Sequence, residues 1–163
     1  MDLRDPLSIE RCANGYAQTF GTVDLIINNA AVLENDLDEC WEVNVLGPWS
    51  VIYFFLPLLK NSRRPRIINV SSSDGLTSKN DSERPIYSAT KAALNSLTRS
   101  LSKELDPIGI PVNAVCPGWI RTDMGGSSAP KSPDEAAVDV LWMLELCPAC
   151  TGKFFKDRKE IPW

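Results

Sequence analysis

Apolar positions follow two periodicities along the chain, and their alternation predicts helices separated by buried strands. Residues 6–20 repeat apolar side chains at helical spacing, after the start signal Asp5–Pro6 and before the stop signal Gly21. Residues 23–28 form a short, nearly continuous apolar run, which is typical of a strand buried on both faces of a parallel sheet. The chain therefore begins with a predicted helix and then a predicted strand.

The same alternation repeats three more times towards the C-terminus. The predicted elements are a helix over 36–60 that Gly47 and Pro48 kink, a strand over 66–70, a helix that opens at Pro85, a strand over 112–115, a helix that opens at a capping box formed by Ser132 and Glu135, and a strand over 152–155.

About four strands separated by helices predict an α/β fold, a doubly wound parallel sheet with right-handed crossovers and helices on both faces. The 163 residues fit one domain, and no internal repeat or linker divides them. In such sheets ligands bind beyond the carboxyl ends of the strands. The segments to examine are therefore residues 28–31, 71–75 and 116–124.

Composition narrows the chemistry more than the fold. The chain is 44% hydrophobic and 23% charged, as ordinary globular proteins are, and its formal net charge of −4 gives no basic surface for nucleic acid. It contains no histidine, which excludes His-based triads, His general bases and His-containing zinc sites. We expect no metal site, and proton transfer must use Tyr, Lys, Asp, Glu, Ser or Cys.

Two further features bear on the compartment. The longest apolar run, residues 51–59, has nine members and contains Pro57, well short of the ~20 needed to cross a bilayer, so we interpret it as a buried helix and expect no membrane partner. The five cysteines are an odd number, and no basic region followed by an apolar stretch opens the chain. We therefore expect a reduced, cytoplasmic setting.

The strand ends carry the residues most capable of chemistry. Tyr87 and Lys91 are four apart at the start of a predicted helix, so both side chains share one helix face. An ammonium within ~4 to 6 Å would lower the pKa of the phenol and make it a usable acid or base. A serine hydroxyl from residues 71–73 could hold a substrate oxygen nearby. Each signal alone also fits chance spacing or an ordinary turn.

In combination, these segments resemble the short-chain dehydrogenase/reductase family, from residue 2 to the C-terminus. The C-terminal TGKFFKDRKEIPW and the CPGWIRTDMGG segment are similar to the carbonyl-reductase-like branch. The matching motifs, in family order, are NNAA at 28–31, VNVLG with Asn44, NVSSSDG with Ser72, YSATK at 87–91, and Pro117–Gly118 followed by Ile120 and Thr122.

The resemblance implies a role for each matching residue. Tyr87 would be the catalytic acid/base, and Lys91 would bind the nicotinamide ribose and depress the pKa of the phenol. Ser72 would orient the carbonyl or hydroxyl group of the substrate. Asn44 would support a proton-relay water near Lys91, although an asparagine within a helix can also serve only to stabilise the neighbouring strand end.

The resemblance further implies a nicotinamide cofactor, NADP or NAD, with a lean towards NADP. The implied reaction interconverts a carbonyl and an alcohol by hydride transfer, on a small-molecule substrate that the sequence does not specify. A homo-oligomer is a possible assembly. Besides Tyr87 and Lys91, the implied cofactor-binding residues are Asn28 and Ala30 on the adenosine-ribose side, Pro117 and Gly118, Ile120 and Thr122 at the carboxamide, and Asp2 with Leu3 near adenine.

One family element has no counterpart in this sequence. The family begins with a strand, a glycine-rich turn and a helix that receives the pyrophosphate, and no strand precedes the first glycine here. We therefore expect residues 1–163 to form a single, partial Rossmann-like NAD(P)-binding domain without the N-terminal strands, in which residues 23–28 become an open edge. An alternative is a non-catalytic α/β module that associates with a full-length relative.

Overall fold

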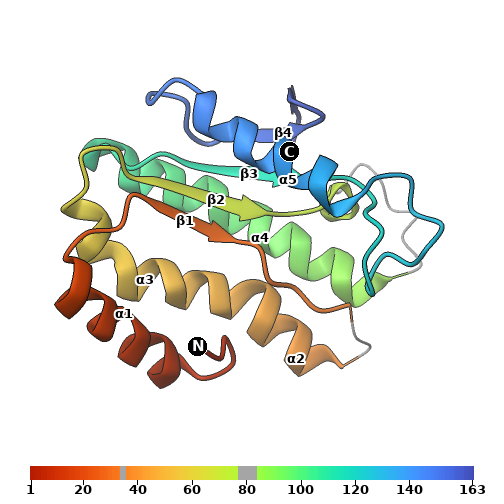
Figure 1. The fold of residues 1–163 in the computed structure, drawn as a ribbon. Helices are drawn as coiled ribbons and strands as arrows, with labels where there is room; N and C mark the ends of the chain where they lie inside the picture. Colours follow the sequence, from red (N-terminus) through yellow and green to blue (C-terminus); the bar gives the residue numbers. More distant parts are fainter. Residues whose placement is uncertain (34–35, 77–83) are drawn as a thin grey trace.

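A computed structural model describes residues 1–33, 36–76 and 84–163. Within these residues, strands and helices alternate as predicted (Figure 1). The elements are α1 (Pro6–Phe20), β1 (Leu25–Asn28), α2 (Leu37–Trp41), α3 (Gly47–Lys60), β2 (Arg66–Val70), α4 (Pro85–Leu105), β3 (Val112–Cys116), α5 (Pro133–Leu141), β4 (Phe154–Lys156) and β5 (Lys159–Ile161).

Local sequence signals explain where the helices begin and end. The Asp5 carboxylate accepts a hydrogen bond from the backbone N–H of Leu7 at the start of α1, and Gly21 ends that helix in the left-handed conformation (φ +72°). At α5, Ser132 and Glu135 form the predicted capping box, each side chain accepting from the other residue's backbone N–H. All three predicted boundaries are confirmed.

The strands form one sheet in the order β1-β2-β3-β4-β5. The first four are parallel, whereas β5 pairs antiparallel with β4. The prediction of about four strands was short by one, because β5 is exposed, carries no apolar run, and follows a turn at Asp157 and Arg158 without glycine. As predicted, β1 lies at an open edge of the sheet with β2 as its sole strand neighbour among the described residues.

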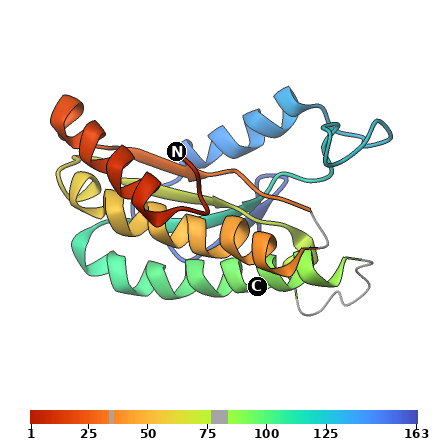
Figure 2. The same ribbon diagram turned by 90° about the horizontal axis from the view of Figure 1, so that it is seen from below.

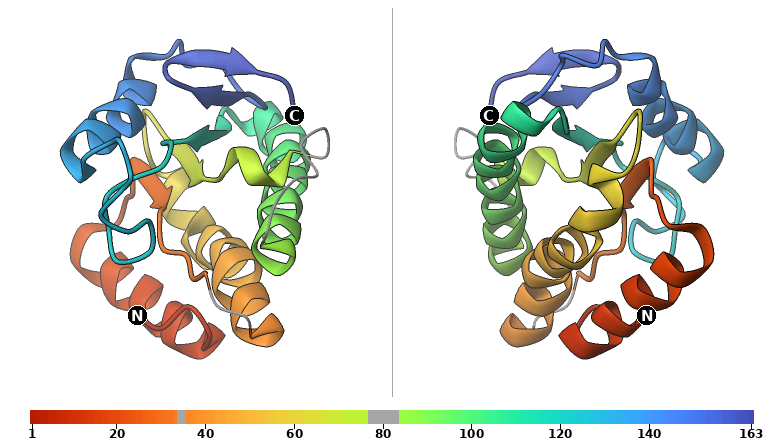
Figure 3. Two further views of the ribbon diagram at one scale, coloured as in Figure 1. Left: turned by 90° about the vertical axis from the view of Figure 1, so that its right-hand side faces the viewer. Right: turned by 90° about the vertical axis from the view of Figure 1, so that its left-hand side faces the viewer.

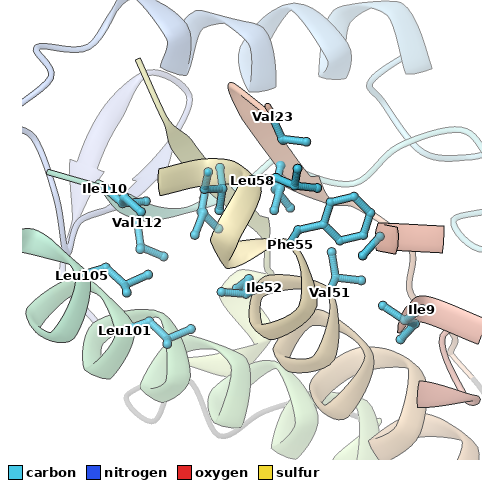
Figure 4. Close-up of a cluster of buried hydrophobic side chains, with 14 residues drawn as sticks. Ile9, Val23, Val51, Ile52, Phe55, Leu58, Leu101, Leu105, Ile110 and Val112 are labelled. Carbon is cyan, nitrogen blue, oxygen red and sulfur yellow. The ribbon is translucent and has the colours of Figure 1, made fainter. Parts of the chain in front are cut away.

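Helices cover both faces of the sheet, as predicted. Seen from below, α1, α3 and α4 lie side by side over one face (Figure 2). Their apolar side chains close a core with β1, β2 and β3 that includes Ile9, Phe55, Leu101 and Val112 (Figure 4). Residues from α5 and the turn after it cover the opposite face, where Met143 packs near Phe155. The carboxyl ends of the strands stay uncovered by these layers.

The helix predicted over 36–60 is interrupted rather than simply kinked. A π-helical turn, Glu42–Leu46, separates α2 from α3, immediately before the glycine and proline expected to cause the bend. The whole stretch Leu37–Lys60 is long and apolar enough, by length and composition alone, to cross a membrane, which the nine-residue count did not anticipate. In this fold 56% of its most apolar window is buried inside the protein, as in the core helix of a globular domain.

Candidate active site

The carboxyl ends of the parallel strands surround a cavity of about 710 Å³. The left view of Figure 3 looks onto this end of the sheet. The lining comes from residues 29–31 after β1, 70–74 at the end of β2, 116–120 at the end of β3, and the start of α4. The three strand ends singled out from the sequence therefore converge at one site.

Ser72, Tyr87 and Lys91 all line this cavity. Pro85 stands in the first turn of α4, so the helix begins just before Tyr87 and presents it together with Lys91 one turn later. The Lys91 ammonium lies 5.6 Å from the centre of the Tyr87 ring. The predicted neighbourhood of phenol, ammonium and hydroxyl is thus present in the folded chain.

Lys91 is a buried cation, with 2% of its surface exposed. Its ammonium donates a hydrogen bond to the backbone carbonyl of Val70, 3.0 Å away, at the end of β2. Burial lowers the pKa of Lys91 to about 8, because the charged form loses hydration. The lysine is therefore still mostly protonated at pH 7, and its charge is less stable there than that of a surface lysine.

The pKa of Tyr87 is shifted in the direction opposite to the expected one. It is raised to about 12, first by burial of the phenol and then by the negative charge of Asp74, while hydrogen bonding with Ser72 offsets part of the rise. The net shift is therefore opposite to the lowering that was predicted from Lys91. The Lys91 ammonium donates to the Val70 carbonyl, and burial keeps the phenol protonated at neutral pH.

Two of the serines after β2, Ser71 and Ser72, have different hydrogen-bond partners. The Ser72 hydroxyl accepts a hydrogen bond from the Asp74 N–H and starts a short 3-10 turn, Ser73–Gly75. The Ser71 hydroxyl is buried and donates to the side-chain oxygen of Asn95 on α4, at 2.6 Å. Of the two, Ser72 keeps its hydroxyl at the cavity in a half-buried position, whereas Ser71 joins strand to helix.

Asn44 does not line the cavity. Its buried side chain lies in the π-helical turn, where its oxygen accepts from the Val32 N–H and its nitrogen donates to the Val32 carbonyl and the Thr90 hydroxyl. These bonds fix the segment after β1 against α4, next to Lys91. The arrangement matches the alternative in which Asn44 stabilises a neighbouring strand end.

Besides Tyr87 and Lys91, which line the cavity, eight residues were assigned to the cofactor, and they divide into two groups. Five of them line the cavity, namely Ala30, Pro117, Gly118, Ile120 and Thr122. Three others do not. Asn28 donates to the Asn69 side chain on β2 at 2.8 Å, Asp2 pairs with Arg4 at 3.3 Å, and Leu3 packs where a Cβ on Gly47 would approach within 2.9 Å. The structure therefore places Ala30 and the residues expected at the nicotinamide end around the cavity, whereas Asn28, Asp2 and Leu3 lie outside its lining.

The cavity also contains residues that the sequence argument missed. Asp74, Cys116 and Trp119 directly neighbour predicted positions, and Lys156 comes from the end of β4. The Cys116 sulfur accepts a hydrogen bond from the Ser73 N–H. The strand-end rule would have found Lys156 had it been applied to the fourth strand as well as to the first three.

The chain is similar to known proteins in both sequence and structure. The family model described as short chain dehydrogenase matches residues 1–133. Oxidoreductase UcpA of Escherichia coli K12 is 35% identical over 98% of this chain, which spans 63% of its length. The Myxococcus xanthus protein C-signal is 34% identical, and 94% of its length is covered against 88% of this chain. The NADPH-bound carbonyl reductase from chicken fatty liver superposes with a TM-score of 0.93, at 28% identity, covering all of this chain and 75% of the enzyme.

Proposed function

This chain belongs to the short-chain dehydrogenase family, in its carbonyl-reductase-like branch, and from that membership we propose that it is an NAD(P)(H)-dependent oxidoreductase. Its reaction would interconvert a carbonyl and an alcohol on a small-molecule substrate by hydride transfer. The chain spans about 63% of the length of the curated UcpA relatives, so its activity has to be measured on this chain itself.

The observation that carries the proposal is the convergence of Ser72, Tyr87 and Lys91 on one cavity. A phenol, an ammonium and a hydroxyl can together bind a carbonyl oxygen and exchange a proton with it without a histidine. Ser72 would hold the substrate oxygen, Tyr87 would exchange a proton with it, and Lys91 would supply positive charge beside them.

The pKa of Tyr87 bears on its proposed role. With its pKa raised to about 12, Tyr87 is protonated at pH 7 and can donate a proton to a carbonyl oxygen. In the reverse reaction the Tyr87 phenolate would accept the proton of the alcohol, and the Lys91 ammonium, 5.6 Å from the ring centre, would be the nearby positive charge.

The lining residues fit the nicotinamide end of a dinucleotide. The buried Lys91 ammonium donates one of its three N–H groups to the Val70 carbonyl, which leaves two N–H groups to donate to ribose hydroxyls. Gly118 lines the cavity beside Pro117 and has a positive φ of +90°, a backbone conformation that glycine adopts most readily. When bound, the cofactor would supply or accept the hydride. The similar carbonyl reductase from chicken fatty liver binds NADPH, which supports NADP over NAD for this chain.

The non-catalytic module is the less favoured alternative, because relatives of this chain are named as oxidoreductases and the groups for proton transfer meet in one cavity. Homo-oligomerisation and a cytoplasmic location remain predictions. Residues 1–163 are proposed to act as a single domain.

The test is NADPH-dependent reduction of a panel of aldehydes and ketones by the purified chain. Tyr87→Phe removes only the phenolic oxygen, and turnover should fall by about 100-fold or more. Tyr53→Phe is the matched control, because Tyr53 is 62% exposed on α3 and outside the cavity lining, and it should keep wild-type turnover. Wild-type turnover in Tyr87→Phe, or no NADPH-dependent reduction by the wild type, would overturn the proposal.

A further inference from the structure

A cluster of four charged side chains lies beside the cavity, apart from the groups proposed to react. The Lys131 ammonium pairs with Asp139 on α5 at 2.7 Å and with Asp157 in the β4–β5 turn at 3.2 Å. Arg158, next in that turn, pairs with the other oxygen of Asp139 at 3.0 Å. Three separate segments therefore meet through these ion pairs.

Lys131 also closes the base of a loop that forms one wall of the cavity. Its backbone bridges to the strand-like segment around Ile120, with Arg121 N–H donating to the Lys131 carbonyl at 2.9 Å. Between these two ends the chain makes a loop, residues 118–130, seen at the right of Figure 1. Trp119 and Met124 from this loop line the cavity.

Hydrogen bonds within the loop hold its two arms together, so we expect its position to depend on how its base is held. The Arg121 guanidinium donates to the carbonyls of Ala129 and Pro130, at 2.9 and 2.6 Å. The Trp119 indole N–H donates to the Gly125 carbonyl at 2.7 Å. These bonds stay within the loop and do not attach it to the sheet or to α5. In the described part of the chain, Lys131 makes the ion pairs that join the base of the loop to α5 and to the β4–β5 turn.

The β4–β5 turn shows an unusual backbone at the same place. Asp157 and Arg158 both have positive φ, 47° and 60°, a region that glycine and asparagine favour. Such conformations persist where surrounding interactions compensate for their strain. Here both strained residues place their side chains in the ion pairs, Asp157 on Lys131 and Arg158 on Asp139. Glycine would relieve the strain and lose these contacts.

The central pair is also less exposed than an ordinary surface ion pair. The side chains of Lys131 and Asp139 are 21% and 16% exposed. The mutual hydrogen bond is the main reason that the pKa of Lys131 is raised and that of Asp139 lowered, so both groups are charged at neutral pH. Partial burial and two-sided pairing of each charge make this cluster stronger than isolated surface pairs.

We propose that Lys131, Asp139, Asp157 and Arg158 form a latch that positions the loop 118–130 as a wall of the cavity. They are positioning residues, because none of the four lines the cavity. The role of that wall in holding substrate rests on the proposed function, whereas the latch itself does not. Breaking the latch would loosen the substrate side of the cavity and leave Ser72, Tyr87 and Lys91 in place.

The direct test is limited proteolysis with a protease specific for arginine, followed by mass spectrometry of the cleavage after Arg121. Lys131→Met keeps the aliphatic stem and removes the charge, and it should accelerate that cleavage about tenfold, since cleavage tracks the population of the open loop. Lys153→Met is the matched control. It removes a lysine ion pair of similar length but greater exposure, Lys153 with Glu160 at 2.8 Å, on the same hairpin but away from the loop.

A second variant separates loop positioning from general stability. Replacing Asp157 by Asn and Arg158 by Gly supplies residues that suit the turn while deleting both of its ion pairs. We expect faster cleavage after Arg121 with an unchanged or raised melting temperature. Wild-type cleavage in both this variant and Lys131→Met would overturn the latch, as would equal acceleration in Lys153→Met.

Kinetics link the latch to the proposed function. In Lys131→Met we expect KM for the carbonyl substrate and KM for NADPH each to rise about tenfold, because the loop carries Gly118, Ile120 and Thr122 of the proposed nicotinamide site. The pH profile of kcat should stay unchanged, because the proton-transfer groups do not move. A fall in kcat at unchanged KM would contradict this role. Absence of turnover in the wild type would overturn the proposed function, and the proteolysis would still decide the latch.

Discussion

Replacing the buried Lys91 should stabilise the folded protein while removing a proposed catalytic group. The ammonium is almost fully buried, has the Val70 carbonyl as its hydrogen-bond acceptor, and has its pKa lowered from 10.5 to about 8 by loss of hydration. Lys91→Met retains a linear side chain of similar volume without the charge. The variant therefore removes a desolvation cost that wild type bears whenever the lysine is protonated.

The magnitude follows from the two pKa values. A folded-state pKa about 2.5 units below that of the unfolded chain destabilises the folded protein by about 3 kcal/mol at pH 7, where both states are mainly protonated. Between about pH 8 and pH 10.5 the unfolded state binds more protons, so stability rises with pH. Subtracting about 1 kcal/mol for the lost hydrogen bond to Val70, we expect Lys91→Met to be about 2 kcal/mol more stable at pH 7.

Urea unfolding of both proteins, at pH 7 and at about pH 9.5, measures this effect. The wild type should gain about 2 kcal/mol over that interval relative to Lys91→Met, so that the two proteins converge at the higher pH. Lys103→Met, at an exposed position of the same helix, should follow the wild type. A Lys91→Met protein less stable than wild type at pH 7, or a parallel pH dependence of the two, would refute the reasoning.

Three further substitutions test the framework of the site. Asn44→Ala should lower the free energy of unfolding in urea by about 1 to 3 kcal/mol, because the half-buried backbone groups of Val32 lose their partners. Gly75→Ala should destabilise the fold by about 1 to 3 kcal/mol and reduce turnover, since its Cβ would stand 2.6 Å from the Lys91 backbone carbon. Ser132→Ala should lower the melting temperature by about 3 °C in calorimetry, through loss of about 1 kcal/mol of helix capping. Unchanged unfolding curves would contradict each expectation.

Much of the fold could be predicted because its signals are local. The cap at Asp5, the stop at Gly21 and the capping box at Ser132 act within a few residues, and the structure confirms all three. The strand β5 could not be predicted in this way. Its stability depends on pairing with β4 and on the ion pairs of its turn, and neither is visible in a sequence of three largely polar residues.

The site was predictable in position and less so in electrostatics. The spacing of Tyr87 and Lys91 fixes that they share a helix face, and the strand-end rule fixes where that face points. The spacing of residues along the sequence does not reveal how deeply their side chains are buried. The burial that raises the pKa of the phenol, and the Val70 carbonyl that holds the ammonium, come from tertiary packing. Tertiary packing also determines where Asp2 and Leu3 lie. Asp2 pairs with Arg4 and Leu3 packs next to Gly47, and neither residue lines the cavity.

The buried polar contacts beneath the cavity also have a dynamic consequence. Asn28 on β1 donates to Asn69 on β2, Asn69 donates to Thr98 on α4, and Thr98 donates to the Leu94 carbonyl one turn earlier. Separating any one of these elements from its neighbour would leave a side-chain amide or hydroxyl without its hydrogen-bond partner. Backbone amides of β1, β2 and the middle of α4 should therefore exchange with deuterium together, as one cooperative opening unit, even though β1 lies at the rim of the sheet.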